Sequence, residues 1–176
     1  MAESRAPDDT SPLGYAPRMS ITILATVDPT RTRVESRTEG GYRILMDAEP
    51  TADATSAEPK EAVLSALAAC TSMDVASILV KKRQRATRYE VAVSGESAEE
   101  HPRVFTSITV EHRVAGAVEA EALRRSIELS STRYCPVSAM LSASVRMEHW
   151  YRLTAEDGTE TRALVAVTGP EGSQVL

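Results

Sequence analysis

The sequence predicts an α+β domain, and two patterns support this fold class. Segments typical of β-strands, by their β-branched residues or by period-two alternation, lie on both sides of one long segment, residues 60–85, which favours helix and holds neither glycine nor proline. The 176 residues make up one domain's length of chain, and 42% apolar against 26% charged residues is a globular composition. We therefore expect one core built from strands and helices.

The N-terminal part is expected to form an antiparallel meander. Residues 20–27 and 41–46 are rich in β-branched and aliphatic side chains, residues 32–36 are a candidate middle strand, and Asp-Pro and Gly-Gly pairs supply the turns. Residues 1–18 hold three of the nine prolines among polar residues, so we expect a flexible extension there.

The long helix is the most unusual segment. Apolar residues cover nearly the whole circumference of residues 62–80, and a helix that is apolar all round must be covered on every side. One chain of this size has too few other elements for that. The sequence therefore predicts a symmetric homodimer in which an antiparallel sheet wraps around two such helices.

The second half of the chain is expected to add a hairpin, helices and strands. Residues 88–97 and 105–114 alternate with period two around a turn, residues 118–130 place Leu123, Ile127 and Ser130 on one helical face, and residues 145–153 are typical of a strand, with one or two more after Thr161. We divide the chain into the extension 1–18, a domain 19–153 and a C-terminal extension 154–176 with a possible extra strand.

Charge and missing motifs exclude several function classes. The formal net charge of −5 disfavours a nucleic-acid binder, which needs a positive surface. No run of about 18 apolar residues and no secretory signal is present, so we expect a cytoplasmic protein without a membrane partner. The histidines lack ligand spacing, which gives a metal site little support, and no serine-hydrolase, dinucleotide or P-loop motif occurs.

The two cysteines are the candidate reactive groups. Cys70 lies in the most apolar segment, where an inert buried thiol and a reactive one are both open interpretations. Cys135 precedes Pro136, which favours the first position of a short helix and puts the thiol at or next to the N-cap. A helix N-terminus lowers a thiol pKa, although a small residue filling a cap is the alternative.

Both cysteine motifs resemble those of the OsmC/Ohr family of osmotically induced and organic-hydroperoxide-resistance proteins. The matching segments are 59–73 (PKEAVLSALAACTSM) and 134–137 (YCPV), with further likeness at 44–47 (ILMD), 74–79 (DVASIL), 89–91 (YEV) and 101–105 (HPRVF). The resemblance covers about residues 20–153 in the family's order. Two cysteine motifs with a hairpin between them make it specific.

The resemblance implies an OsmC-like fold, an intertwined homodimer and thiol-dependent reduction of organic hydroperoxides in oxidative stress defence. Cys70 would be the peroxidatic thiol and Cys135 the resolving thiol, with no metal, haem or flavin cofactor. An external dithiol would reset the pair, and a lipoyl protein is one candidate. An apolar pocket would favour organic peroxides, with core packing as the alternative role for each residue that could line it: Leu67, Met73, Met140 and Leu141.

The sequence departs from the hydroperoxide-resistance branch after the first proline. That branch has a glutamate there which orients an arginine onto the reactive cysteine, whereas this chain has Lys60 followed by Glu61. Glu61 is the carboxylate nearest to the position of the branch's glutamate, which makes it a candidate catalytic residue. Nine residues of helix, however, place it on the side opposite Cys70 and about 13 Å away along the axis, so capping of the first turn is the competing interpretation.

The sequence offers several charged residues that could act on the Cys70 thiol. Asp74 lies at i+4 from Cys70, where an unpaired carboxylate would raise the thiol pKa, so catalysis would require an arginine between them. The candidate arginines are Arg31, Arg33, Arg37, Arg43 and Arg133. The rival hypothesis is a non-catalytic dimeric domain that binds a small apolar ligand, and the reactivity of Cys70 separates the two.

Overall fold

The computed structural model describes residues 20–30, 32–47 and 56–176. The chain divides into two compact units, residues 1–56 and 57–176, which we describe one at a time. The extension predicted for residues 1–18 and the candidate Arg31 lie outside the described residues.

The first unit holds the antiparallel meander that the sequence predicts. Its strands are β1 (Ile23–Asp28), β2 (Arg33–Thr38) and β3 (Arg43–Met46), paired in the order β1-β2-β3. In the β2–β3 turn Gly41 has φ +82°, a left-handed conformation that glycine adopts without the steric penalty of a Cβ. The Gly-Gly pair therefore marks the turn for a physical reason.

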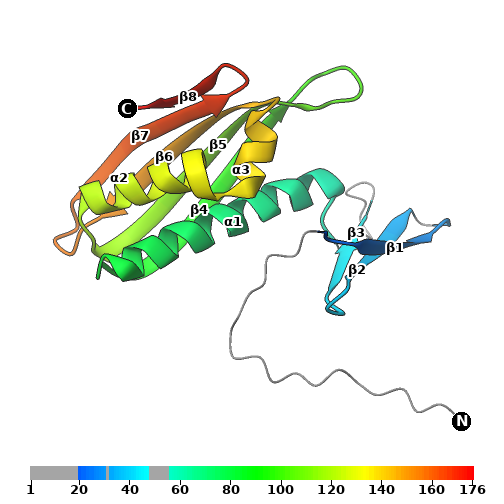
Figure 1. Cartoon of the computed structure of the whole chain (residues 1–176), viewed down its shortest axis with the longest axis horizontal. Helices are drawn as coiled ribbons and strands as arrows, with labels where there is room; N and C mark the ends of the chain where they lie inside the picture. The colour runs from blue at the N-terminus through cyan, green and yellow to red at the C-terminus, as the bar shows by residue number, and fades with distance from the viewer. Residues whose placement is uncertain (1–19, 31, 48–55) are drawn as a thin grey trace, which may run out of the picture. The chain divides into compact units, whose positions relative to one another are not determined.

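The second unit is one five-stranded sheet with helices on one face (Figure 1). Its elements are α1 (Pro59–Lys81), β4 (Arg85–Ser97), β5 (Phe105–Ala117), α2 (Ala120–Leu129), the π-helical turn η1 (Ser130–Tyr134), α3 (Pro136–Ser142), β6 (Arg146–Thr154), β7 (Glu160–Gly169) and β8 (Gly172–Val175). The sheet order is β4-β5-β6-β7-β8. The hairpin and the later strands are confirmed. The β5–β6 pair is parallel, because α2 and α3 carry the chain back across the sheet before β6 begins.

Helix α1 ends earlier than the predicted Arg85. Lys82 caps it, Arg83 adopts φ +57°, and Arg85 already pairs with Ala117 in the sheet. The residues after Lys82 have good helix propensity, but ladder hydrogen bonds with β5 satisfy their backbone groups instead. Local propensity is overridden here by the hairpin.

One face of α1 is buried by the chain's own sheet and helices. Its buried residues recur every fourth position: Leu67, Thr71, Val75 and Leu79. Other apolar side chains of α1 face solvent in the single chain, with Met73 71% and Val80 73% exposed. Among the described helices α1 has the length and composition of a membrane span, and the core helix of a soluble domain shares both.

The core has two clusters on either side of a polar layer. Val75 and Leu79 pack with Leu123 and Ile127 of α2, as their helical spacing predicts. Leu67 packs in a second cluster with Met147 of β6 and with other buried residues, namely Ile108, Val110, Cys135 and Val145. Thr71 lies on α1 between Leu67 and Val75, so it is the buried residue between the clusters.

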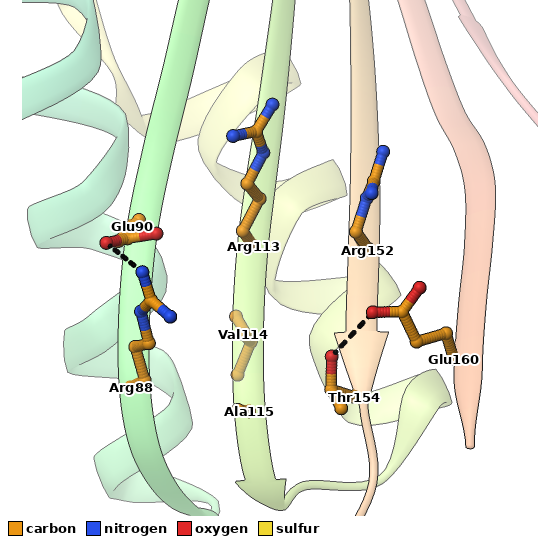
Figure 2. A pocket seen from close by; sticks show the side chains of 8 residues that line it. All are labelled: Arg88, Glu90, Arg113, Val114, Ala115, Arg152, Thr154 and Glu160. Carbon is orange, nitrogen blue, oxygen red and sulfur yellow. Dashed lines mark hydrogen bonds and ion pairs between the residues drawn. The ribbon is translucent and has the colours of Figure 1, made fainter. Parts of the chain in front are cut away.

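The opposite face of the sheet is charged. Glu111 of β5 accepts hydrogen bonds from Arg113 and Arg162, both at 2.7 Å, and Arg152 lies 3.6 Å away. Burial opposes ionisation of Glu111, but the hydrogen bonds from Arg162 and Arg113 outweigh it and lower its pKa to about 2. Figure 2 shows Arg113 and Arg152 side by side on β5 and β6 in a pocket of this face. The arrangement is a network of ion pairs on the side of the sheet away from the helices.

Candidate functional site

The two cysteines, 65 positions apart in sequence, meet where α1 lies beside the start of α3. Cys70 lies in the middle of α1, and Cys135 is the N-cap of α3, as its place before Pro136 predicts. The Ser138 N–H donates to Cys135 Sγ at 3.3 Å, so an otherwise unpaired first-turn donor serves the sulfur. Cys135 is 3% exposed, and Cys70 is partly exposed.

Asp74 completes the cluster, one turn of α1 after Cys70. The two sulfur atoms and an Asp74 carboxylate oxygen all lie within 4.8 Å of one another. Three such donors are one fewer than the four protein ligands of a structural zinc site and equal the three of a catalytic one. The cluster consists of a thiol pair with a carboxylate beside it.

The surroundings of Cys70 oppose its ionisation. Burial and the hydrogen bond with Cys135 raise the pKa of the Cys70 thiol to about 11, the charge of Asp74 adds to the rise, and the Val137 N–H works against it. Burial disfavours the charged thiolate, and a nearby carboxylate repels it. In the described chain Cys70 is a protonated thiol at neutral pH.

A line of buried polar side chains joins Asp74 to the sheet. The Ser130 hydroxyl donates to Asp74 Oδ2 at 3.0 Å and lies 3.1 Å from Thr71 Oγ1. Thr71 Oγ1 is 3.4 Å from Nε2 of His112, and the other ring nitrogen, Nδ1, is 2.7 Å from the Tyr89 hydroxyl. Thr71, His112 and Ser130 are fully buried.

Thr71 and His112 were not predicted as site residues, although the sequence holds a signal for each. Thr71 is the polar member of a face that repeats every fourth residue between Leu67 and Val75. His112 has the inward parity of Ile108 and Val110 on β5. A polar residue at a core position needs a buried partner, which could have singled out both side chains.

The π-helical turn η1 places Ser130 for its part in the site. The Cys135 N–H donates to the Ser130 carbonyl at 2.9 Å, which closes a five-residue turn in place of an α-helical one. The Ser130 side chain meanwhile reaches Asp74. One residue of this turn thus contacts both the segment of the second cysteine and the helix of the first.

The structure separates the four predicted pocket residues into two pairs. Leu67 and Leu141 belong to the cluster that also contains Cys70 and Cys135. Met73 and Met140 are 71% and 67% exposed in the single chain. A groove beside the site runs along α1 to Asp74, and its lining includes Ile78, Leu129, Tyr134 and the lysines Lys81 and Lys82.

The candidate charged partners have other contacts. The Glu58 N–H donates to the Glu61 carboxylate at 2.9 Å, so Glu61 caps the first turn of α1. Cys70 lies in the middle of the same helix, away from Glu61. Arg33 pairs with Asp47, Arg37 and Arg43 pair with Glu35, and Arg133 lies over the Tyr134 ring. The groups that shift the Cys70 pKa most include no arginine of the described chain.

Lys60, which replaces the branch's glutamate, holds the β4–β5 loop. Its ammonium donates to Ser97 Oγ at 2.5 Å and to the Arg103 carbonyl at 2.9 Å, and lies 4.6 Å from the centre of the Phe105 ring. Lys60→Met keeps the aliphatic stem and removes all three contacts. We expect it to lower the free energy of unfolding by about 1 kcal/mol, measured by urea denaturation.

A control for that variant is available on the same helix. Lys81→Met removes a lysine from the last turn and should change the free energy of unfolding by less than about 0.5 kcal/mol. Equal effects of the two substitutions would show that the Lys60 contacts add no stability.

Comparison with known proteins identifies relatives that match more than half of the chain. The family model described as OsmC-like protein matches residues 52–149. Protein YhfA of Escherichia coli K12 is 40% identical over 116 residues, which is 65% of this chain and 85% of YhfA.

Solved structures give the same result for the fold. A hypothetical protein from Aquifex aeolicus VF5 has a TM-score of 0.69 at 26% identity, over 78% of this chain and 98% of that one. An organic hydroperoxide resistance protein OsmC from Legionella pneumophila has a TM-score of 0.56 at 11% identity, over 74% of this chain and 94% of its own, a likeness of fold alone. The family match includes Cys70, Asp74 and Cys135.

Proposed function

The chain belongs to the OsmC-like protein family, and from that membership we propose that it is a thiol peroxidase that reduces organic hydroperoxides with Cys70 and Cys135. The observation that carries the proposal is the convergence of the two thiols. Their sulfur atoms lie within 4.8 Å of each other, so a disulfide of about 2 Å needs a modest movement of the start of α3.

The proposed reaction has two steps in the protein. The Cys70 sulfur attacks the outer oxygen of the hydroperoxide, the O–O bond breaks, and the alkoxide leaves as an alcohol after it takes up the proton that Cys70 lost. Cys70 is now a sulfenic acid. The Cys135 sulfur then attacks the Cys70 sulfur, water leaves, and a disulfide forms. An external dithiol gives two electrons and two protons to restore both thiols.

The environment of the pair suits an apolar peroxide. Leu67, Leu141 and other apolar side chains pack around the sulfurs, and a groove lies beside Asp74, the neighbour of Cys70. Apolar walls favour an organic hydroperoxide over hydrogen peroxide. The proposal includes a homodimer built on the exposed apolar side chains of α1, because a single chain leaves Met73 and Val80 in water.

Intact mass after one equivalent of cumene hydroperoxide tests the proposal. Wild type should lose two hydrogens and both free thiols, Cys135→Ser should stop at a trappable sulfenic acid, and Cys70→Ser should leave Cys135 unmodified. Hydrogen peroxide at the same dose should react more slowly.

The outcomes separate the rival assignments. If Cys135 in the Cys70→Ser variant reacts as fast as Cys70 does in wild type, the two roles are reversed. If neither thiol reacts faster than free cysteine, a non-catalytic domain that binds a small apolar ligand is the better interpretation. The raised pKa of Cys70 is the observation that favours this second candidate.

A further inference from the structure

The hydrogen-bond line from Tyr89 to Asp74 runs in one direction, because each hydroxyl has one proton to donate. The Ser130 hydroxyl donates its only proton to Asp74 Oδ2, so in its contact with Thr71 it can only accept a hydrogen bond. Thr71 has then used its proton, and its oxygen must accept from Nε2 of His112. A neutral imidazole has one N–H, so Nδ1 accepts from the Tyr89 hydroxyl.

The two ring groups of this line stay neutral. Burial lowers the pKa of His112 to about 3, with a contribution from His149, and burial together with the charge of Asp74 raises the pKa of Tyr89 above its usual value. Neither group gains or loses a proton near neutral pH. The direction of the line is therefore fixed, and every donor along it points toward the Asp74 carboxylate.

One oxygen of the carboxylate at the end of the line lies within 4.8 Å of the Cys70 sulfur. We propose that Asp74 is the catalytic proton carrier of the Cys70 reaction, held toward the thiol by this one-way hydrogen-bond line. The inference rests on the proposed peroxidase function and assigns a role that a carboxylate beside a thiol would not suggest from its charge alone. Thr71, Ser130 and His112 are positioning residues, because they act through Asp74.

The path of the proton is consistent with this role of Asp74. Asp74 takes the proton from the Cys70 sulfur as that sulfur attacks the peroxide, and then gives the same proton to the leaving alkoxide, which becomes the alcohol. The site holds one negative charge before and after the transfer to Asp74, whereas loss of the proton to solvent would leave a thiolate beside a carboxylate. A distance within 4.8 Å is covered by one bridging water or a small rotation of the side chain.

The charge effect and the proton-carrier role predict opposite results for Asp74→Asn. An amide keeps the shape of the carboxylate and removes its charge. If Asp74 merely repels the thiolate, the substitution should speed the formation of sulfenic acid, since its charge raises the pKa of Cys70. If Asp74 carries the proton, the rate should fall about 100-fold, as for the loss of a general acid–base group.

Thr71 provides a matched pair for the line itself. Thr71→Val keeps the shape and removes the hydroxyl, so Ser130 loses its fixed donor and the carboxylate loses its fixed direction. We expect a rate about tenfold below that of wild type, with rescue by Thr71→Ser, which restores the hydroxyl. Ser131→Ala is the control, because the buried Ser131 hydroxyl donates to the Glu128 carbonyl and lies outside the line.

Nitrogen-15 NMR of the full-length protein at pH 7 reads the direction without any peroxide. His112 should be neutral with its proton on Nε2 in wild type and Thr71→Ser, and should lose this single tautomer in Thr71→Val. His149, whose Nε2 lies 3.1 Å from Thr168, is outside the line and should be unchanged in all three proteins.

Stopped-flow rates of sulfenic acid formation with cumene hydroperoxide complete the test. The inference is supported by the Nε2 tautomer together with slow Asp74→Asn and Thr71→Val proteins. It is overturned if His112 carries its proton on Nδ1, or if Asp74→Asn reacts as fast as wild type or faster. If the wild-type thiol does not react faster than free cysteine, the proposed function is overturned instead. The His112 tautomer would then still show whether the hydrogen-bond line has the inferred direction.

Discussion

Met73→Glu is expected to convert a dimer into a monomer in sedimentation experiments. Met73 lies on α1 and is 71% exposed in the single chain, and in the proposed homodimer a second copy of the chain covers it. A carboxylate at this point would have to lose its water in the interface, which costs several kcal/mol without a partner. That penalty is a large part of the free energy that holds an ordinary dimer together.

The control for this variant is an exposed apolar residue outside α1. Val104 is 58% exposed in the segment between β4 and β5, and Val104→Glu should leave the dimer intact. Circular dichroism should show that both variants keep their secondary structure. A wild-type chain that sediments as a folded monomer at every concentration would refute the dimer.

Lowering the pH from 7 to 5 is expected to remove about 2 kcal/mol of stability for each buried histidine. Burial lowers the pKa of His112 to about 3 and that of His149 to about 4, against 6.5 for an exposed histidine. Below pH 6.5 His112 and His149 each bind a proton in the unfolded chain but stay neutral in the folded chain. Their contribution is therefore complete above pH 6.5 and is lost as the pH falls toward the folded-state values.

Urea denaturation at the two pH values, at one protein concentration, measures this loss. Glu111 does not confuse the result, because its pKa of about 2 and its ordinary value both lie below the range. His149→Leu should roughly halve the difference between pH 7 and pH 5. His101→Gln is the matched control on an exposed turn and should leave it unchanged. A wild-type difference in the free energy of unfolding below about 1 kcal/mol between the two pH values would show that the two histidines are protonated in the folded state.

Local patterns were enough to predict most of the elements. The spacing of Leu123 and Ile127 predicted the buried face of α2, and Pro136 predicted the start of α3 with Cys135 as its cap. The end of α1 was wrong, because Arg85 has neighbours that favour helix but partners in β5 that form a sheet. The π-helical turn at Ser130 and the parallel β5–β6 pair also went unpredicted.

By itself the sequence determined the fold class, the order of helices and strands, the family and the identity of the two thiols. These properties are written in residues that are neighbours along the chain, because periodicity, caps and motifs act over a few positions. The i+4 spacing of Asp74 from Cys70 is also local, but the tertiary structure alone decided which buried polar groups join Asp74 to the sheet. Asp74, Ser130 and His112 come from three different elements, and what joins them is the packing of α1 and the π-helical turn against β5, which no local pattern encodes.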